Sequence, residues 1–108
     1  MFGFQRHKVT SFTATEIAER HQAGEVVLVD VREPSEFAAG HIEGAVLVPL
    51  SSFDPAALPQ GQLVLYCAVG RRSAVAAESC RKAGVPVLGH LGGGLQEWVG
   101  AGLKLARE

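Results

Sequence analysis

Cysteine is scarce in this 108-residue sequence, which contains only Cys67 and Cys80. Two cysteines are too few for the disulfide framework of a small secreted domain. Neither belongs to a CxxC pair or has the cysteine–histidine spacing of a zinc site, so we expect no metal and no cofactor. A chain of this length buries roughly two-thirds of its surface on folding and needs no such support. In a reducing compartment, a lone cysteine is then open to a catalytic interpretation.

The sequence also lacks an excess of charge and any long apolar run. Its 10 lysines and arginines nearly balance its 11 aspartates and glutamates, which gives no indication of a nucleic-acid or membrane partner. No apolar run approaches the ~20 residues of a transmembrane helix. The opening MFGFQRHKVT has no apolar core of a secretory signal. We therefore expect a cytoplasmic protein that folds as one domain over residues 1–108.

Strand and helix patterns alternate along the chain. Four apolar segments are expected to be strands, the first three buried on both faces: residues 25–31, 44–50, 62–67 and 85–91. Four helices are expected over residues 13–24, 33–40, 72–84 and 92–102. Thr13 and Glu16 have the spacing of a capping box, and Ser73 is the expected N-cap of the third helix. The alternation predicts an α/β fold in which helices cover both faces of a parallel sheet.

The loop after the third predicted strand carries the strongest chemical signal. Cys67 ends that strand, and ligands of a parallel sheet bind at the carboxyl ends of its strands. Gly70 permits a positive φ in the tight reversal that follows. Backbone N–H groups of such a loop, together with a helix N-terminus, favour an anion. A free cysteine is only ~3% thiolate at pH 7, and a pKa lower by about two units would make the thiolate dominant. We expect this sulfur at the molecular surface.

Each of these residues also has an interpretation without a catalytic role. Considered without the residues that follow it, Cys67 could simply be a small buried apolar residue at the end of a strand. Arg71 and Arg72 could be a solvated pair. A helix start is an unfavourable place for cations, however, so a nearby anion explains the arginines better. Arg72 is the preferred residue for substrate binding, and Arg71 is left open.

Four motifs in order identify a family resemblance over residues 26–103. They are LVDVREPSEFAAGHIEGA, GAVLVPL, YCAVGRRSA and LGGGLQEW. The sequence resembles the rhodanese-like sulfurtransferase family in its small single-domain form, and YCAVGRRSA is similar to the active-site loop Cys-x-x-Gly-x-Arg-Ser. Gly92 stands where many relatives have an acidic residue.

The resemblance implies a rhodanese-like fold with a central parallel sheet of about five strands. It implies that Cys67 takes a sulfane sulfur from thiosulfate, a polysulfide or a persulfide and passes it to cyanide or a thiol. The implied substrate-binding residues are those of the loop: Ala68, Val69, Gly70, Arg71, Arg72 and Ser73. Asp30 and Arg32 are implied to face this loop and support it. A sulfur-acceptor protein is a further implied partner.

Three other functions remain as alternatives. The chain could be a sulfur-carrier module that delivers persulfide sulfur between proteins, or a binding domain without activity. The intact loop argues against the second of these, because inert members commonly lose the cysteine. Related phosphatases place five residues between cysteine and arginine to hold a tetrahedral oxyanion. Here only four residues separate Cys67 from Arg72, which favours a single sulfur atom over a phosphate.

The remaining polar and aromatic candidates are expected to be structural. Glu33 and Glu36 are expected to cap or flank the short helix, and His41 to be a hydrogen-bonded turn residue. Cys80 and Trp98 are expected in the core. The other histidines show no paired spacing and are expected to be solvated or locally bonded: His7, His21 and His90.

Overall fold

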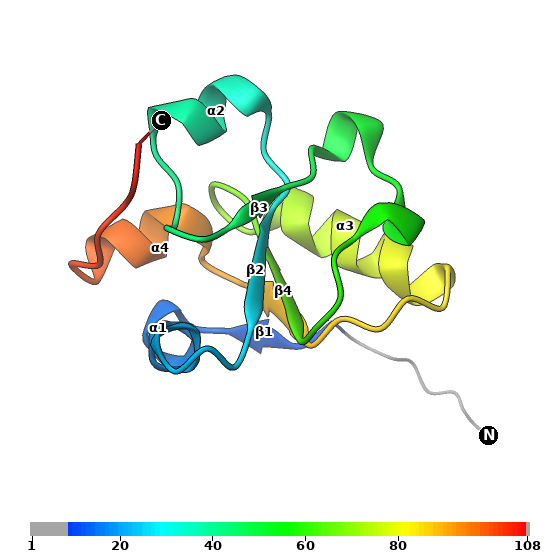
Figure 1. Ribbon diagram of the computed structural model, residues 1–108, viewed down its shortest axis with the longest axis horizontal. Coiled ribbons are helices and arrows are strands. Elements are labelled where there is room, and N and C mark those ends of the chain that lie inside the picture. Colours follow the sequence, from blue (N-terminus) through cyan, green and yellow to red (C-terminus); the bar gives the residue numbers. More distant parts are fainter. Residues whose placement is uncertain (1–8, 108) are drawn as a thin grey trace.

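The computed structural model describes residues 9–107, and its centre is a sheet of five parallel strands (Figure 1). In chain order, the strands are β1 (Ser11–Phe12), β2 (Val27–Asp30), β3 (Val46–Leu47), β4 (Leu63–Tyr66) and β5 (Gly89–Leu91). Their order across the sheet is β1-β5-β4-β2-β3, and every pairing is parallel. Strand β4 is therefore central, and the loop that follows it is flanked by the segments that follow β2 and β5.

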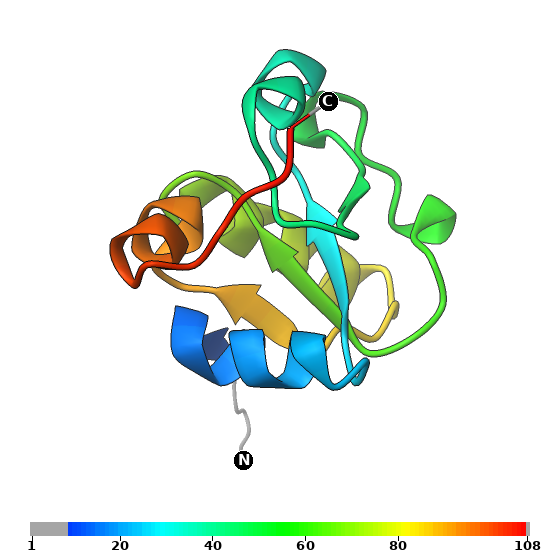
Figure 2. The same ribbon diagram turned by 60° about the vertical axis from the view of Figure 1, so that its left-hand side comes forward.

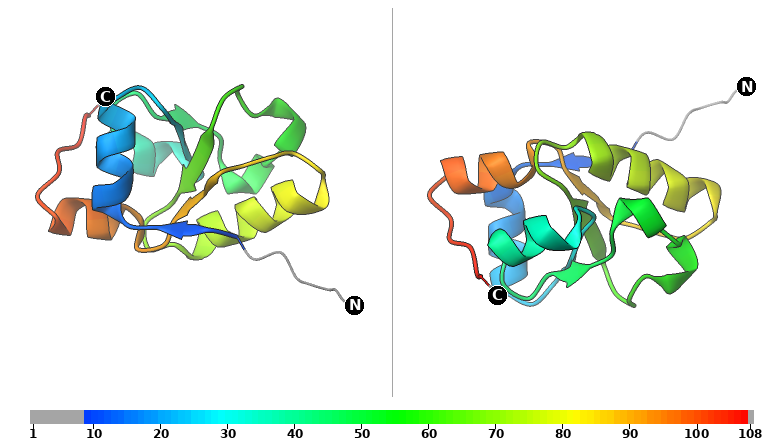
Figure 3. Two further views of the ribbon diagram at one scale, coloured as in Figure 1. Left: turned by 90° about the horizontal axis from the view of Figure 1, so that it is seen from below. Right: turned by 90° about the horizontal axis from the view of Figure 1, so that it is seen from above.

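Helices cover both faces of this sheet, which confirms the predicted α/β fold. The helices are α1 (Ala14–Gln22), α2 (Pro34–Ala39), α3 (Arg71–Lys82) and α4 (Gly94–Gly100), with 3-10 turns η2 (Leu50–Ser52) and η3 (Pro55–Ala57). Figure 3 shows α1 and α4 on one side of the sheet and α3 with the two 3-10 turns on the other. Helix α2 lies beyond the carboxyl end of β2 (Figure 2).

The first helix begins where the sequence predicts. The side chain of Thr13 accepts a hydrogen bond from the Glu16 amide at 3.2 Å, and the Glu16 carboxylate accepts one from the Thr13 amide at 2.8 Å. This reciprocal capping box confirms the expectation, and the loss of such a cap costs about 1 kcal/mol.

The central strand contributes to two apolar layers at once. Val64 and Tyr66 pack with the cluster that includes α1 and α4, whereas Leu63, Leu65 and Cys67 pack with the cluster under α3. Both faces are buried because successive side chains of a strand point to opposite sides. This explains why β4 has a continuous apolar sequence, without polar alternation.

The predicted strand over residues 44–50 is wrong in extent and in burial. Only Val46–Leu47 form β3, and Val46 is 39% exposed. β3 pairs with β2 alone, so it is an edge strand with one unpaired side. Strand β1 was not predicted, because two residues at the opposite edge are too short to produce an alternating pattern.

Several structural expectations outside the loop are confirmed. Cys80, near the end of α3, is fully buried, and Trp98 is 4% exposed, with its indole N–H donating to the Lys104 carbonyl at 3.1 Å. His41 exchanges backbone hydrogen bonds with Ala106 and stacks on the Phe37 ring.

Two expectations concern the first residues of the chain. His7 lies outside the described residues, and so does most of the opening segment MFGFQRHKVT, for which no secretory signal was expected. Among residues 9–107, no helix has the length and apolar character needed to cross a bilayer.

Candidate active site

The loop after β4 turns its backbone toward the sulfur of Cys67. The Gly70 amide donates to Cys67 Sγ at 3.2 Å, and the Ser73 amide donates at 3.3 Å. The Ser73 hydroxyl lies 3.6 Å from the same sulfur. Strand β4 places the cysteine at the carboxyl edge of the sheet, and the first turn of α3 supplies the last donors. The arrangement is a small cradle for one negatively charged atom.

This cradle shifts the ionisation of the thiol. Burial acts against the charged form, but hydrogen bonds from Ser73, Gly70 and Val69 outweigh it and lower the pKa of Cys67 below its ordinary value. The other cysteine behaves oppositely, because burial without such donors raises the pKa of Cys80. Cys67 is thus the thiol of the chain that the fold prepares as a thiolate.

The expectation that the sulfur lies at the surface is wrong. Cys67 is only 1% exposed and packs against Val29, Val31 and Ala76. The start of α4 is hydrogen-bonded to the beginning of the loop, because the Leu95 amide donates to the Cys67 carbonyl at 2.8 Å. The sulfur is therefore enclosed, although it sits at the predicted edge of the sheet.

Glycines allow two backbone segments to meet beside the sulfur. Gly70 has φ +95°, and a Cβ there would lie 2.2 Å from the Gly92 carbonyl oxygen. Gly94 has φ +63°, and a Cβ there would lie 2.4 Å from the Ala68 carbonyl oxygen. A side chain at either position would push the segment after β5 off the cysteine loop.

The prediction that Ser73 caps the third helix is wrong. Helix α3 begins at Arg71, and its N-cap is Gly70 in the left-handed conformation. Ser73 therefore lies within the first turn of the helix, where it is fully buried. This position gives it two contacts with the sulfur, one from its amide and one from its hydroxyl.

Arg72 is held by a carboxylate from another helix. Its two terminal nitrogens donate to Glu36 of α2 at 2.9 and 3.0 Å. This pairing lowers the pKa of Glu36 to about 2. Glu36 also accepts from the Glu33 amide at 2.9 Å, which confirms the expected capping role of this pair. Arg71, in contrast, is exposed and has no ion-pair partner among the described residues.

Asp30 and Arg32 form a buried ion pair beside the loop rather than on it. The Arg32 guanidinium donates to Asp30 at 2.7 to 3.1 Å and to the Gly40 carbonyl at 2.7 Å. It also lies over the Tyr66 ring, 5.9 Å from its centre. The pair thus joins the end of α2 to the residue that precedes Cys67, which is an indirect support of the loop.

Sequence reasoning missed His90. This histidine of β5 is 7% exposed rather than solvated, and its Nδ1 lies 2.8 Å from the Ser73 hydroxyl. His21, the other described histidine of that group, lies 2.8 Å from the Glu43 carbonyl through its Nε2. No local pattern pointed to His90, because its partner is 17 residues away on α3.

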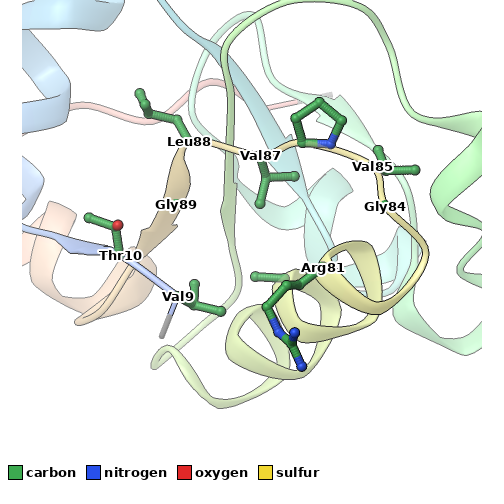
Figure 4. Close-up of a pocket in the computed structure, with 10 residues that line it drawn as sticks. Val9, Thr10, Arg81, Gly84, Val85, Val87, Leu88 and Gly89 are labelled. Atoms are coloured by element: carbon green, nitrogen blue, oxygen red, sulfur yellow. The ribbon is translucent and has the colours of Figure 1, made fainter. Parts of the chain in front are cut away.

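An open apolar groove of about 400 Å³ lies elsewhere in the molecule (Figure 4). It is lined by Val9 and Thr10, by the segment from Gly84 to Gly89, and by Arg81 near the end of α3. The cysteine loop lies at the opposite end of this helix, so the groove is not part of the cradle. Within residues 9–107, no group of three or more His, Cys, Asp or Glu side chains could hold a metal ion.

Known proteins are similar to this chain in sequence. The chain is 46% identical over 94 residues to an uncharacterized Synechocystis protein, covering 84% of this chain and 52% of that protein. It is 39% identical to the probable adenylyltransferase/sulfurtransferase MoeZ of Mycobacterium tuberculosis, covering 87% of this chain and 26% of that protein. It therefore spans about half the length of the first relative and about a quarter of the second.

A solved structure is similar to this chain in fold. A rhodanese-related protein from Thermoplasma volcanium superposes with a TM-score of 0.81 at 29% identity, covering 91% of this chain and 98% of that one. The sequence model of the rhodanese-like domain matches residues 13–101, a range that includes strands β2 to β5 and the cysteine loop. The family match and the shared fold together show that the chain is a member of the rhodanese-like domain family.

Proposed function

We propose that this chain is a sulfurtransferase that carries a sulfane sulfur on Cys67. The observation that supports this most directly is the convergence of the Gly70 and Ser73 amides on Cys67 Sγ, at 3.2 and 3.3 Å. Donors in this arrangement stabilise a thiolate before the reaction, so no general base has to contact the sulfur. The Mycobacterium relative is named as a probable adenylyltransferase/sulfurtransferase, which agrees with this chemistry.

The proposed reaction has two displacement steps. The Cys67 thiolate attacks the outer sulfur of thiosulfate, the S–S bond of thiosulfate breaks, and sulfite leaves with the electron pair. Cys67 then carries a persulfide whose outer sulfur is electrophilic. A cyanide ion or a thiolate attacks that sulfur and forms thiocyanate or a new persulfide, and the Cys67 thiolate leaves. The same sequence with a polysulfide or a persulfide donor releases the corresponding shortened thiolate.

The size of the cradle favours sulfur over a phosphoryl group. Four residues separate Cys67 from Arg72. The loop directs its donors at the cysteine sulfur itself, and this sulfur is only 1% exposed. In a phosphorylated cysteine, three oxygen atoms surround the atom that is bonded to Cys67 Sγ, whereas in a persulfide that atom is a single sulfur.

Mass spectrometry of the intact protein tests the proposal. Incubation with thiosulfate, followed by removal of the donor, is expected to add the mass of one sulfur atom. Sulfate is the matched control, since it has the same charge but no sulfane sulfur. Cyanide or a small thiol should then remove the added sulfur; persistence of the adduct with both acceptors would favour a carrier for a protein acceptor. Absence of an adduct with thiosulfate, polysulfide and persulfide alike would disprove the proposal.

The Arg72–Glu36 pair predicts how the chain discriminates between donors. An anionic donor has to compete with Glu36 for the Arg72 guanidinium, because this carboxylate already accepts from both terminal nitrogens and offsets the positive charge. Glu36→Gln removes the negative charge but keeps an oxygen for the Glu33 amide. We expect the KM for thiosulfate to fall about two- to five-fold, the range for a partly exposed ion pair. The KM for an uncharged trisulfide donor should stay unchanged.

A matched control for this variant is available on α3. Glu78→Gln also removes one exposed carboxylate that pairs with an arginine, Arg81, but near the far end of that helix. It should leave both KM values unchanged. Equal changes for the anionic and the uncharged donor in Glu36→Gln would contradict the assignment of Arg72 to anion binding.

A further inference from the structure

The Ser73 hydroxyl lies between two titratable groups inside the protein. Its oxygen is 3.6 Å from Cys67 Sγ and 2.8 Å from His90 Nδ1. Ser73 is fully buried, and His90 is 7% exposed. The three residues come from the end of β4, the first turn of α3 and strand β5. Only the adjacency of β4 and β5 in the sheet brings them together.

A hydroxyl has a single proton, and Ser73 has three neighbours that could take it. Besides the sulfur and the imidazole, the Gly70 carbonyl lies 3.3 Å from the hydroxyl oxygen. If His90 accepts at Nδ1, the proton points away from the sulfur and Ser73 can only accept from a neutral thiol. If His90 carries a proton on Nδ1 and donates it to Ser73, the hydroxyl proton is free to point at a thiolate.

The environment of His90 suits a neutral ring that can change its tautomer. Burial lowers the pKa of His90 below its ordinary value, so the ring is uncharged at neutral pH. Among the described residues, its Nε2 has no hydrogen-bond partner, and no buried side-chain nitrogen or oxygen lacks one. Nε2 therefore keeps contact with solvent, through which it can gain or lose a proton.

We propose that His90 is a positioning residue for Cys67: its Nδ1-protonated ring donates to Ser73 Oγ and thereby directs the Ser73 hydroxyl proton onto the sulfur. The Ser73 hydroxyl then joins the backbone amides of the loop as a donor to the thiolate. On ionisation, the thiol proton passes to Ser73 Oγ, the Ser73 proton passes to His90 Nδ1, and the Nε2 proton leaves to water. Serine remains a hydroxyl and histidine remains neutral, so only the sulfur changes charge.

The other charged groups around this site are carboxylates and guanidinium groups. Arg71 and Arg72 lie on α3, Glu36 lies on α2, and the Asp30–Arg32 pair follows β2. Carboxylates and guanidinium groups ordinarily keep their charge between pH ~6 and ~9. Tyr66 on β4 has a pKa raised by burial, which removes it from that range as well. An ionisation seen there at Cys67 therefore reports on the thiol and its hydrogen-bonded neighbours.

Alkylation by iodoacetamide as a function of pH tests the role of His90. Peptide mass mapping separates Cys67 from Cys80. In His90→Phe and Ser73→Ala, the loss of the hydroxyl donor should move the Cys67 profile to higher pH and lower the rate below pH ~7 about tenfold. His90→Asn should restore most of the wild-type profile, because its side-chain N–H can replace the Nδ1–H. His21→Phe, the same change at a histidine outside the site, should have no effect.

A double variant distinguishes positioning from a general effect on stability. Because His90 acts through Ser73, the addition of His90→Phe to Ser73→Ala should produce no further shift of the alkylation profile. Additive shifts, or a wild-type profile in either single variant, would overturn the proposal. If His90→Phe does not fold, the comparison of His90→Asn with Ser73→Ala tests the proposal. The proposal would be overturned if His90→Asn shifted the Cys67 alkylation profile as far as Ser73→Ala does. Any role of His90 in catalysis rests on the proposed sulfur transfer, whereas alkylation requires no sulfur donor, so the two can fail separately.

Discussion

Cys67→Ser is expected to abolish both the sulfur adduct and sulfur transfer, with a loss of turnover of at least about 10³-fold. Serine has the same shape, so the amides of Gly70 and Ser73 can still point at the side-chain atom. A hydroxyl stays protonated at neutral pH, however, and an oxygen cannot form the persulfide. The measurements are the intact mass after incubation with thiosulfate and the rate of thiocyanate production with cyanide as acceptor.

The control for this variant is the second thiol. Cys80→Ser removes a fully buried cysteine whose pKa is raised by burial. It is expected to lose some stability, because a polar group replaces a thiol in the core, but to retain loading of one sulfur atom. Thiocyanate production at the wild-type rate by Cys67→Ser would show that the reaction does not pass through this residue.

Gly70→Ala is expected to destabilise the fold strongly, although it adds only one methyl group. A Cβ at this position would lie 2.2 Å from the Gly92 carbonyl oxygen, and the residue would also have to keep φ at +95°. The left-handed conformation alone costs about 1–2 kcal/mol, and the clash forces the two segments apart. We expect the free energy of unfolding to fall by roughly 3–5 kcal/mol. Urea denaturation measures this change.

Gly102→Ala separates the conformational cost from the clash. Gly102 has a similar φ of +82°, but a Cβ there would meet nothing within 4 Å. It should cost only about 1–2 kcal/mol. Alkylation of Cys67 should slow in Gly70→Ala, because the Gly70 amide leaves the sulfur, and stay unchanged in Gly102→Ala. Equal destabilisation of the two variants would mean that the contact with Gly92 contributes nothing.

The cysteine loop was largely predictable because its information is local. An apolar run that ends in a cysteine, a glycine three residues later and a helix start beyond it are all features of neighbouring residues. They led to the correct strand and the correct reversal, and in the structure the amides of Gly70 and Ser73 point at the sulfur. The choice of N-cap was wrong, because it depends on where Gly70 meets the Gly92 carbonyl, and Gly92 belongs to another part of the chain.

The groups that adjust the thiol were not predictable in the same way. Glu36 reaches Arg72 across 36 positions of sequence, and His90 reaches Ser73 across 17. In the sequence, Glu36 is a helix-capping residue and His90 is one histidine among four. The enclosure of Cys67 was missed for a related reason: burial depends on which segments cover a loop, and here the start of α4 does so.

The order of hydrophobic runs, turn residues and helix caps along the chain was enough to identify the α/β class and to single out Cys67 and the loop around it as the candidate site. Those features arise from interactions among residues a few positions apart, so the order of the residues is enough to predict them. The lateral order β1-β5-β4-β2-β3 is different, since it follows from how whole strands and helices pack. That order places β5 and the α2 segment on either side of the cysteine loop, and so brings His90 and Glu36 to the groups that contact or flank the sulfur.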